Sequence, residues 1–217
     1  MLIILRVRYY AIAKDLLNFP NCRSLFEVQA LLMLALFYLH HAQMTDAYAV
    51  CSFALTCSLQ IGMHRNLNLD ATLLEIEMRR RTFFTIRRLQ MYLNAVLGLP
   101  KAMQDIDVDQ KLPLEIDDAQ LSAVGINTHI SNGQSCTTAI ANAHSRLVNI
   151  LPKMMGLMVS KPSQTTSGHK TVYKISQKNL KEVENELRQW SENLPKYIWP
   201  GYAQQPAHLE KYVLIQS

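Results

Sequence analysis

Three aspartates at alternating positions, Asp105, Asp107 and Asp109, have the spacing of the first ligands in a calcium-binding loop. Such a loop also requires a glycine at its sixth position and a bidentate glutamate at its twelfth. Those two positions hold Gln110 and Ile116 in this chain. We therefore predict that the three aspartates belong to a capped turn and do not bind calcium.

A second acidic pair, Asp117 and Asp118, is similar to the start of the aspartate-rich magnesium sites of all-helical prenyl-chain enzymes. Such a site needs a further carboxylate one helical turn later, where this chain has Leu121. The sequence also lacks a Gly-x-Ser-x-Gly nucleophile elbow and a glycine-rich phosphate loop. We expect no catalytic residue, no cofactor-binding residue and no metal ligand. A metal-dependent isoprenoid-type enzyme is kept as the less favoured alternative.

The histidines and cysteines do not form a metal site by spacing. His40 and His41 are adjacent, so on a helix their side chains point about 100° apart and cannot chelate one ion. His64 follows a glycine in a predicted loop, where we expect it to pack or cap. The four cysteines contain no closely spaced pair of the kind that zinc clusters use, and we expect buried, reduced thiols.

The composition indicates a globular chain with a substantial core and no membrane segment. Of the 217 residues, 49% are hydrophobic and 18% are charged, so several helices should be buried on most of their surface. The apolar run 30–39 is about half as long as a bilayer-spanning helix requires. The net charge of +5 is spread along the chain, and the densest basic segment, 79–88, also contains a helical pattern. We predict salt-bridged or solvated arginines there, with no direct DNA contact.

Helical periodicity covers most of the chain and predicts an all-α fold of about six to eight helices with a long central connecting loop. The first two helices, over 25–39 and from 45 to Gly62, form a hairpin. A long third helix begins after Thr72, whose spacing to Glu75 indicates a capping box, and ends at Gly98.

The long helix contains two pairs at the spacing that favours ion pairs, Glu75 with Arg79 and Glu77 with Arg81. Its predicted inward stripe includes Met78, Thr82, Phe83, Ile86, Leu89, Leu93, Val96 and Leu97. If exposed, the charged pairs should organise the helix more than they stabilise it.

The second half of the chain has a weaker pattern. Residues 99–132 read as the connecting loop, and a helix over 136–150 should be interrupted or kinked by Pro152. A polar linker is predicted over 160–171 and a further helix over 180–194. A last helical pattern starts at Pro206 and has no terminator, from which we expect a truncated chain. We treat residues 1–217 as one helical domain.

The order of local motifs over 24–113 resembles the middle homology region of fungal zinc-cluster transcription factors, also called the fungal-specific or xylanolytic-activator-type regulatory domain. The residues that carry this resemblance are Gln29, Gly62, His64, Arg65, Glu77, Arg79, Arg80, Arg81, Phe84, Gly98, Pro100, Asp105, Asp107 and Pro113. Each motif alone is weak, but their common order is specific. The chain departs from the family at Gln90 and Leu99, where members often carry aspartate and arginine.

The resemblance implies a regulatory domain that acts on an attached DNA-binding head in the nucleus. The six-cysteine zinc cluster of that head lies outside these 217 residues, so zinc and DNA contact are expected only through it. A small-molecule effector, a transcriptional co-regulator and a homodimer of the full-length form are implied as partners, with no membrane. A helical interaction scaffold unrelated to transcription remains the other alternative.

Overall fold

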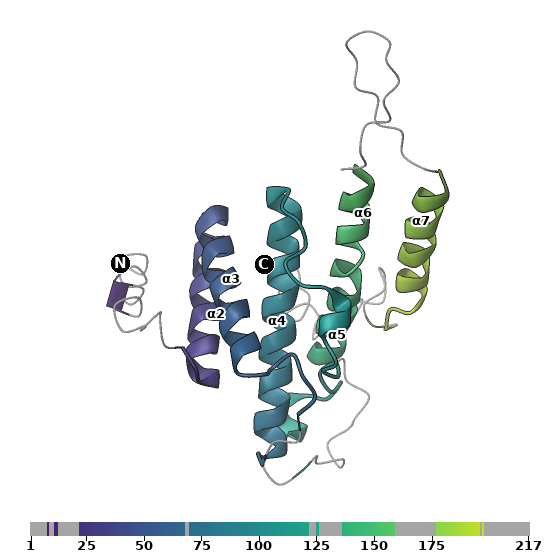
Figure 1. Cartoon of the computed structure of the whole chain (residues 1–217). Helices are drawn as coiled ribbons and strands as arrows, with labels where there is room; N and C mark the ends of the chain where they lie inside the picture. The colour runs from purple at the N-terminus through teal and green to yellow at the C-terminus, as the bar shows by residue number, and fades with distance from the viewer. Residues whose placement is uncertain are drawn as a thin grey trace. The chain divides into compact units, whose positions relative to one another are not determined.

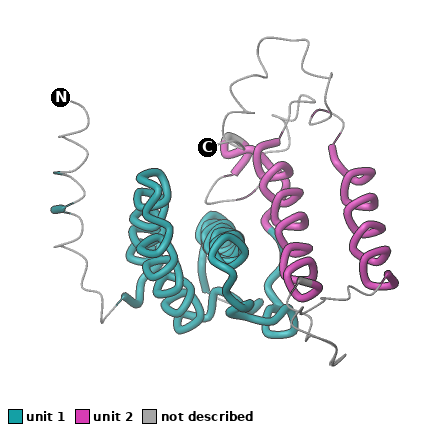
Figure 2. Tube along the Cα trace, turned by 90° about the horizontal axis from the view of Figure 1, so that it is seen from above, with its two compact units in different colours: residues 1–112 teal, residues 113–217 magenta. Residues whose placement is uncertain are grey.

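The structure is a computed structural model that describes residues 8, 11–12, 22–67, 70–121, 125, 136–158, 177–195 and 197. The predicted linker 160–171 and the predicted helix after Pro206 lie outside these residues. The chain divides into two compact units, Met1–Leu112 and Pro113–Ser217, where the sequence predicted a single domain (Figure 2). Within the described ranges there are helices and no β-strand, which confirms the all-α fold class.

In the described part of unit 1, three α-helices lie side by side (Figure 1). Helix α2 spans Leu25–His40, α3 spans Met44–Gln60 and α4 spans Leu73–Leu97. A full capping box starts α2, because Ser24 Oγ accepts from Glu27 N at 3.3 Å and the Glu27 carboxylate accepts from Ser24 N at 2.8 Å. The predicted hairpin of the first two helices is confirmed, and its turn holds Ala42 at φ 56°.

The core of unit 1 is formed where small residues of α3 face large residues of its neighbours. Ala47, Cys51 and Ala54 recur at helical spacing on the buried face of α3. Their small side chains let α2 and α4 approach closely, and Phe83 and Phe84 of α4 pack edge to face in the same core at a centroid distance of 5.4 Å. The aromatic pair thereby buries a large apolar surface in the core, and its edge-to-face packing favours one orientation of the two rings.

Polar side chains on the buried part of α4 bond to both neighbouring helices. Gln29 Nε2 of α2 donates to Thr82 Oγ1 at 3.2 Å, and Gln90 Nε2 donates to Ser52 Oγ of α3 at 3.0 Å. Of the predicted inward stripe, Val96 is instead 51% exposed, because it lies in the last turn before the helix ends. The buried face of α4 therefore combines apolar packing with specific hydrogen bonds to α2 and α3.

Both ends of α4 follow the sequence prediction. Thr72 Oγ1 accepts from Glu75 N at 3.2 Å, which is one of the two bonds of a capping box. Gly98 closes the helix at φ 69°, a left-handed conformation that glycine adopts without steric cost. The chain then returns through a short 3-10 helix, η2 at Asp105–Asp107.

Unit 2 contains η3 at Asp118–Gln120, α5 at Thr137–Val148, α6 at Leu151–Met158 and α7 at Gln177–Glu192. Pro152 lies in the first turn of α6, where its missing amide proton costs nothing, so the predicted interruption separates two helices. Leu180 is 53% exposed, whereas Val183 is buried. None of the described helices has both the length and the apolar composition needed to cross a membrane.

Candidate functional site

The loop between α3 and α4 is shaped by one glycine and one buried methionine. Gly62 adopts φ 72°, and a Cβ placed there would lie 2.8 Å from Cδ1 of Leu67. The side chain of Met63 is fully buried in the core of unit 1. The chain therefore turns immediately after α3, and residues 65–67 line a pocket together with residues from the first two turns of α4.

Glu77 is a carboxylate without exposed surface near the start of α4. Arg81 Nε donates to its Oε1 at 3.0 Å, and Arg80 Nη1 lies 3.7 Å from its Oε2. The arginine side chains are 19% and 14% exposed respectively. A buried charge is tolerated only when it is paired, so the two guanidinium groups are held on either side of this carboxylate.

Arg79 does not pair with Glu75 as the sequence predicted, but binds the backbone at the start of the α3–α4 loop. Its Nη2 donates to the backbone carbonyl of Ile61 at 2.6 Å, and Ile61 is the residue that caps α3. The expected ion pair between Glu75 and Arg79 is wrong: Arg79 has no ion pair with a described residue. A backbone carbonyl at the C-terminal end of a helix has no partner within the helix and is a good acceptor. Here the carbonyl of Ile61 accepts from Arg79 in place of the exposed carboxylate of Glu75.

Gln110 joins the loop, α4 and the segment that follows η2. Its backbone N donates to His64 O at 3.1 Å, and its Nε2 donates to Arg65 O at 2.8 Å and to Met63 O at 3.3 Å. Its Oε1 accepts from Arg80 Nε at 3.1 Å. The sequence pattern does not single out this residue, because a lone glutamine in a loop carries no motif.

The outer side of the loop is bound by Asp109. Its Oδ1 accepts from Asn66 N at 2.9 Å, and its Oδ2 lies 3.9 Å from Arg65 Nη1. Both side chains of that ion pair are about half exposed, so it contributes little to stability. The pKa of His64 is lowered by burial and by the charge of Arg65, against the smaller opposing effect of Asp109 and Asp107. Burial and the charge of Arg65 thus favour neutral His64, and its packing or capping role stays a prediction.

These groups surround a pocket of about 250 Å³, here called the arginine pocket. Its lining consists of Gly62, Arg65, Asn66, Leu67, Ile76, Arg79, Arg80 and Gln110. The described residues of this lining include three arginines and no carboxylate. Four of the residues predicted from the resemblance, in the loop and on α4, therefore line one pocket.

The other predicted residues of unit 1 have structural positions. Phe84 packs in the core, Gly98 ends α4, and exposed Pro100 lies in the turn beyond it. Asp105 accepts from Arg87 and, at 2.8 Å, from Lys101 Nζ. The bonds to these two cations lower the pKa of Asp105, although its partial burial acts in the opposite direction.

Two further motif residues, Asp107 and Pro113, make hydrogen bonds away from the arginine pocket. Asp107 Oδ2 accepts from Gln104 N at 3.1 Å, which gives the capped turn predicted from the sequence. Pro113 is buried in unit 2, and its carbonyl accepts from Asn142 Nδ2 at 2.9 Å. Among the described residues, no three histidine, cysteine or acidic side chains are grouped so that they could hold a metal ion.

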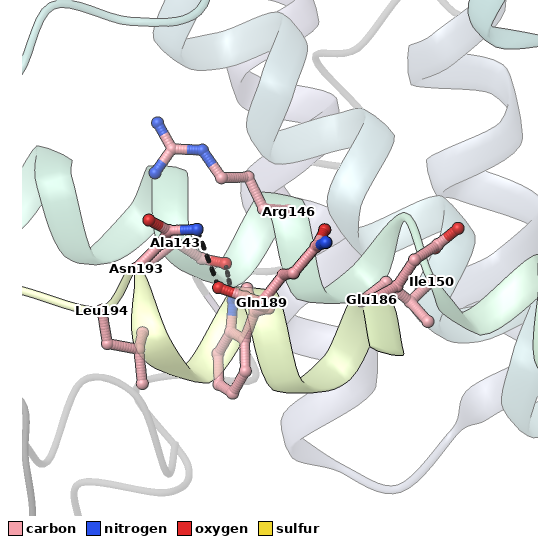
Figure 3. A pocket seen from close by; sticks show the side chains of 8 residues that line it. Ala143, Arg146, Ile150, Glu186, Gln189, Asn193 and Leu194 are labelled. Carbon is pink, nitrogen blue, oxygen red and sulfur yellow. Dashed lines mark hydrogen bonds between the residues drawn. The ribbon is translucent and has the colours of Figure 1, made fainter. Parts of the chain in front are cut away.

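A second pocket, of about 220 Å³, lies between α5 and α7 in unit 2 (Figure 3). Trp190 Nε1 donates to Ala143 O at 2.8 Å at its base. Its charged residues already have partners, since Arg146 lies 3.5 Å from Glu115 and Glu186 lies 2.5 Å from Lys153. The charges of this pocket are matched, unlike those of the arginine pocket.

Comparison with known proteins gives related sequences of one kind. The chain is 34% identical over 196 residues to "Activator of stress genes 1" of Saccharomyces cerevisiae, covering 89% of this chain and 20% of that protein. It is 28% identical over 205 residues to "Activator of stress genes protein 1" of Candida albicans, covering 89% and 21%. "Transcriptional activator protein acu-15" of Neurospora crassa is 29% identical over 152 residues, covering 70% of this chain and 15% of that protein.

The chain spans about a fifth or less of the length of these curated relatives. No solved structure matches it significantly. The profile described as "Fungal specific transcription factor domain" matches residues 6–192, which include the α3–α4 loop, all of α4 and the helices of unit 2. The motif order and this match over most of the sequence agree, and the chain belongs to the fungal specific transcription factor domain family.

Proposed function

We propose that this chain is a regulatory region that modulates transcription through a DNA-binding domain of the longer protein to which it belongs. The domain family and the relative named as a transcriptional activator support this function. In this proposal the chain performs no chemistry itself and acts in the nucleus. It contacts DNA only through the attached domain, and an effector or co-regulator changes its activity.

The bonds of three consecutive arginines on α4 carry the proposal. Arg79 bonds to Ile61 at the start of the α3–α4 loop, and Arg80 bonds to Gln110 in the segment after η2. Arg80 and Arg81 both lie within ion-pair distance of the buried Glu77, which holds them on α4. Because these segments share bonds, a change at one of them alters the others. A regulatory region needs such a set, since a bound molecule shifts an equilibrium only when it has different interactions with the two states.

The test places residues 1–217 between a heterologous zinc-cluster DNA-binding domain and an activation region, with a reporter gene in yeast. Three versions are compared: the unmodified chain, Glu77→Gln and the matched control Glu75→Gln, whose side chain is exposed on the same helix. We expect Glu77→Gln to change reporter output at least about threefold, at equal protein level and equal affinity for the DNA site, because about 0.7 kcal/mol is enough for that change.

The control should resemble the unmodified chain, because Glu75 makes no side-chain ion pair with Arg79. The proposal is wrong if output is the same for the unmodified chain, for Glu77→Gln and for a fusion from which residues 1–217 are deleted. A change in both glutamate variants would show a general effect of charge on α4 and would also contradict the role of the buried carboxylate.

A further inference from the structure

We propose that the arginine pocket binds a small carboxylic acid with a short apolar body, and that this acid is the effector of the regulatory region. The inference rests on the proposed function for its biological role. The binding itself follows from the charges, donors and apolar walls of the pocket.

The charge of the pocket lining is unbalanced. Arg65, Arg79 and Arg80 line it, and no carboxylate is found among the other described residues of the lining. Glu77 lies behind the wall and is shared by Arg80 and Arg81, and Asp109 is 3.9 Å from the exposed end of Arg65. Arg79 has no ion pair with a described residue. An anion that enters the pocket therefore gains attraction from a charge that the described part of the protein leaves uncompensated.

Hydrogen-bond donors remain available on these arginines. A guanidinium group has five N–H donors in a planar fork, which matches the two oxygens of a carboxylate. Arg79 donates one bond to Ile61 O, and Arg80 donates its Nε–H to Gln110 Oε1. The loop side and the helix side of the pocket can thus bind the same carboxylate, Arg65 from the loop and Arg79 from α4.

The remaining walls favour an acid with a hydrocarbon part over a bare inorganic anion. Leu67 and Ile76 line the same pocket, and Gly62 leaves its wall without a side chain. Leu67 is 50% exposed, so a ligand that covers it removes apolar surface from water. A volume of about 250 Å³ lies below that of most pockets for drug-sized ligands and suits a small metabolite.

The position of the pocket connects binding to regulation. Arg65 belongs to the loop, whereas Arg79 and Arg80 belong to α4 and bond to Ile61 and Gln110. A carboxylate held by both sides joins the loop to the helix and changes the bonds through which Arg79 and Arg80 already connect α4 to the loop and to Gln110. Binding energy is therefore available to favour one arrangement of the loop over another.

The test uses isothermal titration calorimetry with the full chain and three probes: 4-methylpentanoate, its neutral amide, and inorganic phosphate. We expect the acid to bind with a dissociation constant of about 1 mM or lower, and the amide and phosphate to bind at least about tenfold more weakly. Arg79→Gln and Arg65→Gln should each weaken binding of the acid about tenfold or more, because each removes a charge-assisted hydrogen bond.

Arg23→Gln is the matched control, since Arg23 is exposed before α2 and does not line the pocket. It should bind the acid as the unmodified chain does. If Arg79→Gln unfolds, as circular dichroism would show, the result for the half-exposed Arg65 decides. Equal binding of acid and amide, stronger binding of phosphate, no binding of the acid, or unchanged binding in the folded pocket variants overturns the proposal.

The two proposals fail separately. If the acid does not bind but Glu77→Gln changes reporter output, the effector site is wrong and the proposed regulatory function is still supported. If the acid binds specifically but reporter output does not depend on residues 1–217, the binding site is supported and the proposed regulatory function is wrong.

Discussion

Arg80 donates its Nε–H to Oε1 of Gln110 at 3.1 Å, across 30 residues of sequence. The amide of Gln110 in turn donates to the carbonyls of Arg65 and Met63. One neutral side chain thus serves both the helix and the loop, with its oxygen facing an arginine and its nitrogen facing backbone acceptors. The orientation of the amide is fixed by these partners, which gives the loop a defined position.

Replacing Gln110 with leucine should loosen the α3–α4 loop without unfolding α4. The substitution removes the donors to Arg65 O and Met63 O and leaves polar groups without partners, at a cost of about 1 to 3 kcal/mol in local opening free energy. Hydrogen exchange of peptides covering 61–67 measures this change. Lys111→Ala, next in the chain and exposed, is the control, and equal exchange in both variants would contradict the role of Gln110.

Replacing Glu77 with glutamine should destabilise unit 1 by about 2 to 4 kcal/mol, because it leaves Arg81 and Arg80 without their buried counter-charge. Urea denaturation followed by circular dichroism measures the free energy of unfolding. Glu75→Gln should lose less than about 1 kcal/mol, the range for an exposed charge in the first turn of a helix. Similar losses in the two variants would show that burial of the carboxylate is unimportant.

Two glycines of unit 1 allow the cost of a positive φ to be separated from the cost of a steric clash with a new side chain. Gly62 and Gly98 both have positive φ, but a Cβ at Gly62 meets Leu67 whereas one at Gly98 meets nothing within 4 Å. Gly98→Ala should cost about 1 to 2 kcal/mol from backbone strain alone. Gly62→Ala should cost slightly more, because the half-exposed Leu67 side chain must also move away from the new methyl group. Thermal or urea unfolding of both variants checks the order, and the reverse order would contradict the loop geometry.

Thiol labelling should distinguish buried from partly exposed cysteines. Burial raises the pKa of the Cys51 thiol to about 12 and that of Cys57 to about 11. At pH 8 only about one Cys51 in ten thousand is then a thiolate, the reactive form. Cys136 is partly exposed and should react first with iodoacetamide. Mass spectrometry of the labelled peptides gives the rates, and equal rates would mean that α3 is open to solvent.

The same thiols predict a loss of stability in alkali. The folded pKa of Cys51 lies above its ordinary value of 9.0, so the folded chain keeps a proton that the unfolded chain releases. The stabilisation is complete below pH 9 and decreases as the pH rises toward 12. Cys51→Ala should therefore reduce the decline in unfolding free energy between pH 9 and pH 10.5 by about 1 to 2 kcal/mol, as measured by urea denaturation. An unchanged decline would contradict the shift.

In unit 2, Trp190→Phe should weaken the contact between α5 and α7. Phenylalanine retains an aromatic ring but lacks the indole N–H that donates to Ala143 O. We expect faster hydrogen exchange in α7, equivalent to about 1 to 2 kcal/mol. Gln189→Ala, on the exposed side of the same pocket, is the control and should have little effect.

The helices of unit 1 were predictable because their signals are local. Periodicity and the glycine at position 98 place the end of α4, and small apolar residues at helical spacing indicate the buried face of α3. The site was only partly predictable. Glu75 with Arg79 and Glu77 with Arg81 have the same spacing, but only the second pair forms, because the carbonyl of Ile61 binds Arg79. That competition depends on a residue 18 positions earlier, which no local pattern contains.

The hydrogen bonds from α4 to its neighbours, Gln29 to Thr82 and Gln90 to Ser52, also fix the position of the helix along its axis. Sliding α4 by a single residue would move each partner by about 1.5 Å and turn it about 100° around the helix axis. Both bonds would break together, one toward α2 and one toward α3. Small sliding motions are therefore opposed, and α4 can shift along its axis relative to α2 and α3 only when both bonds break.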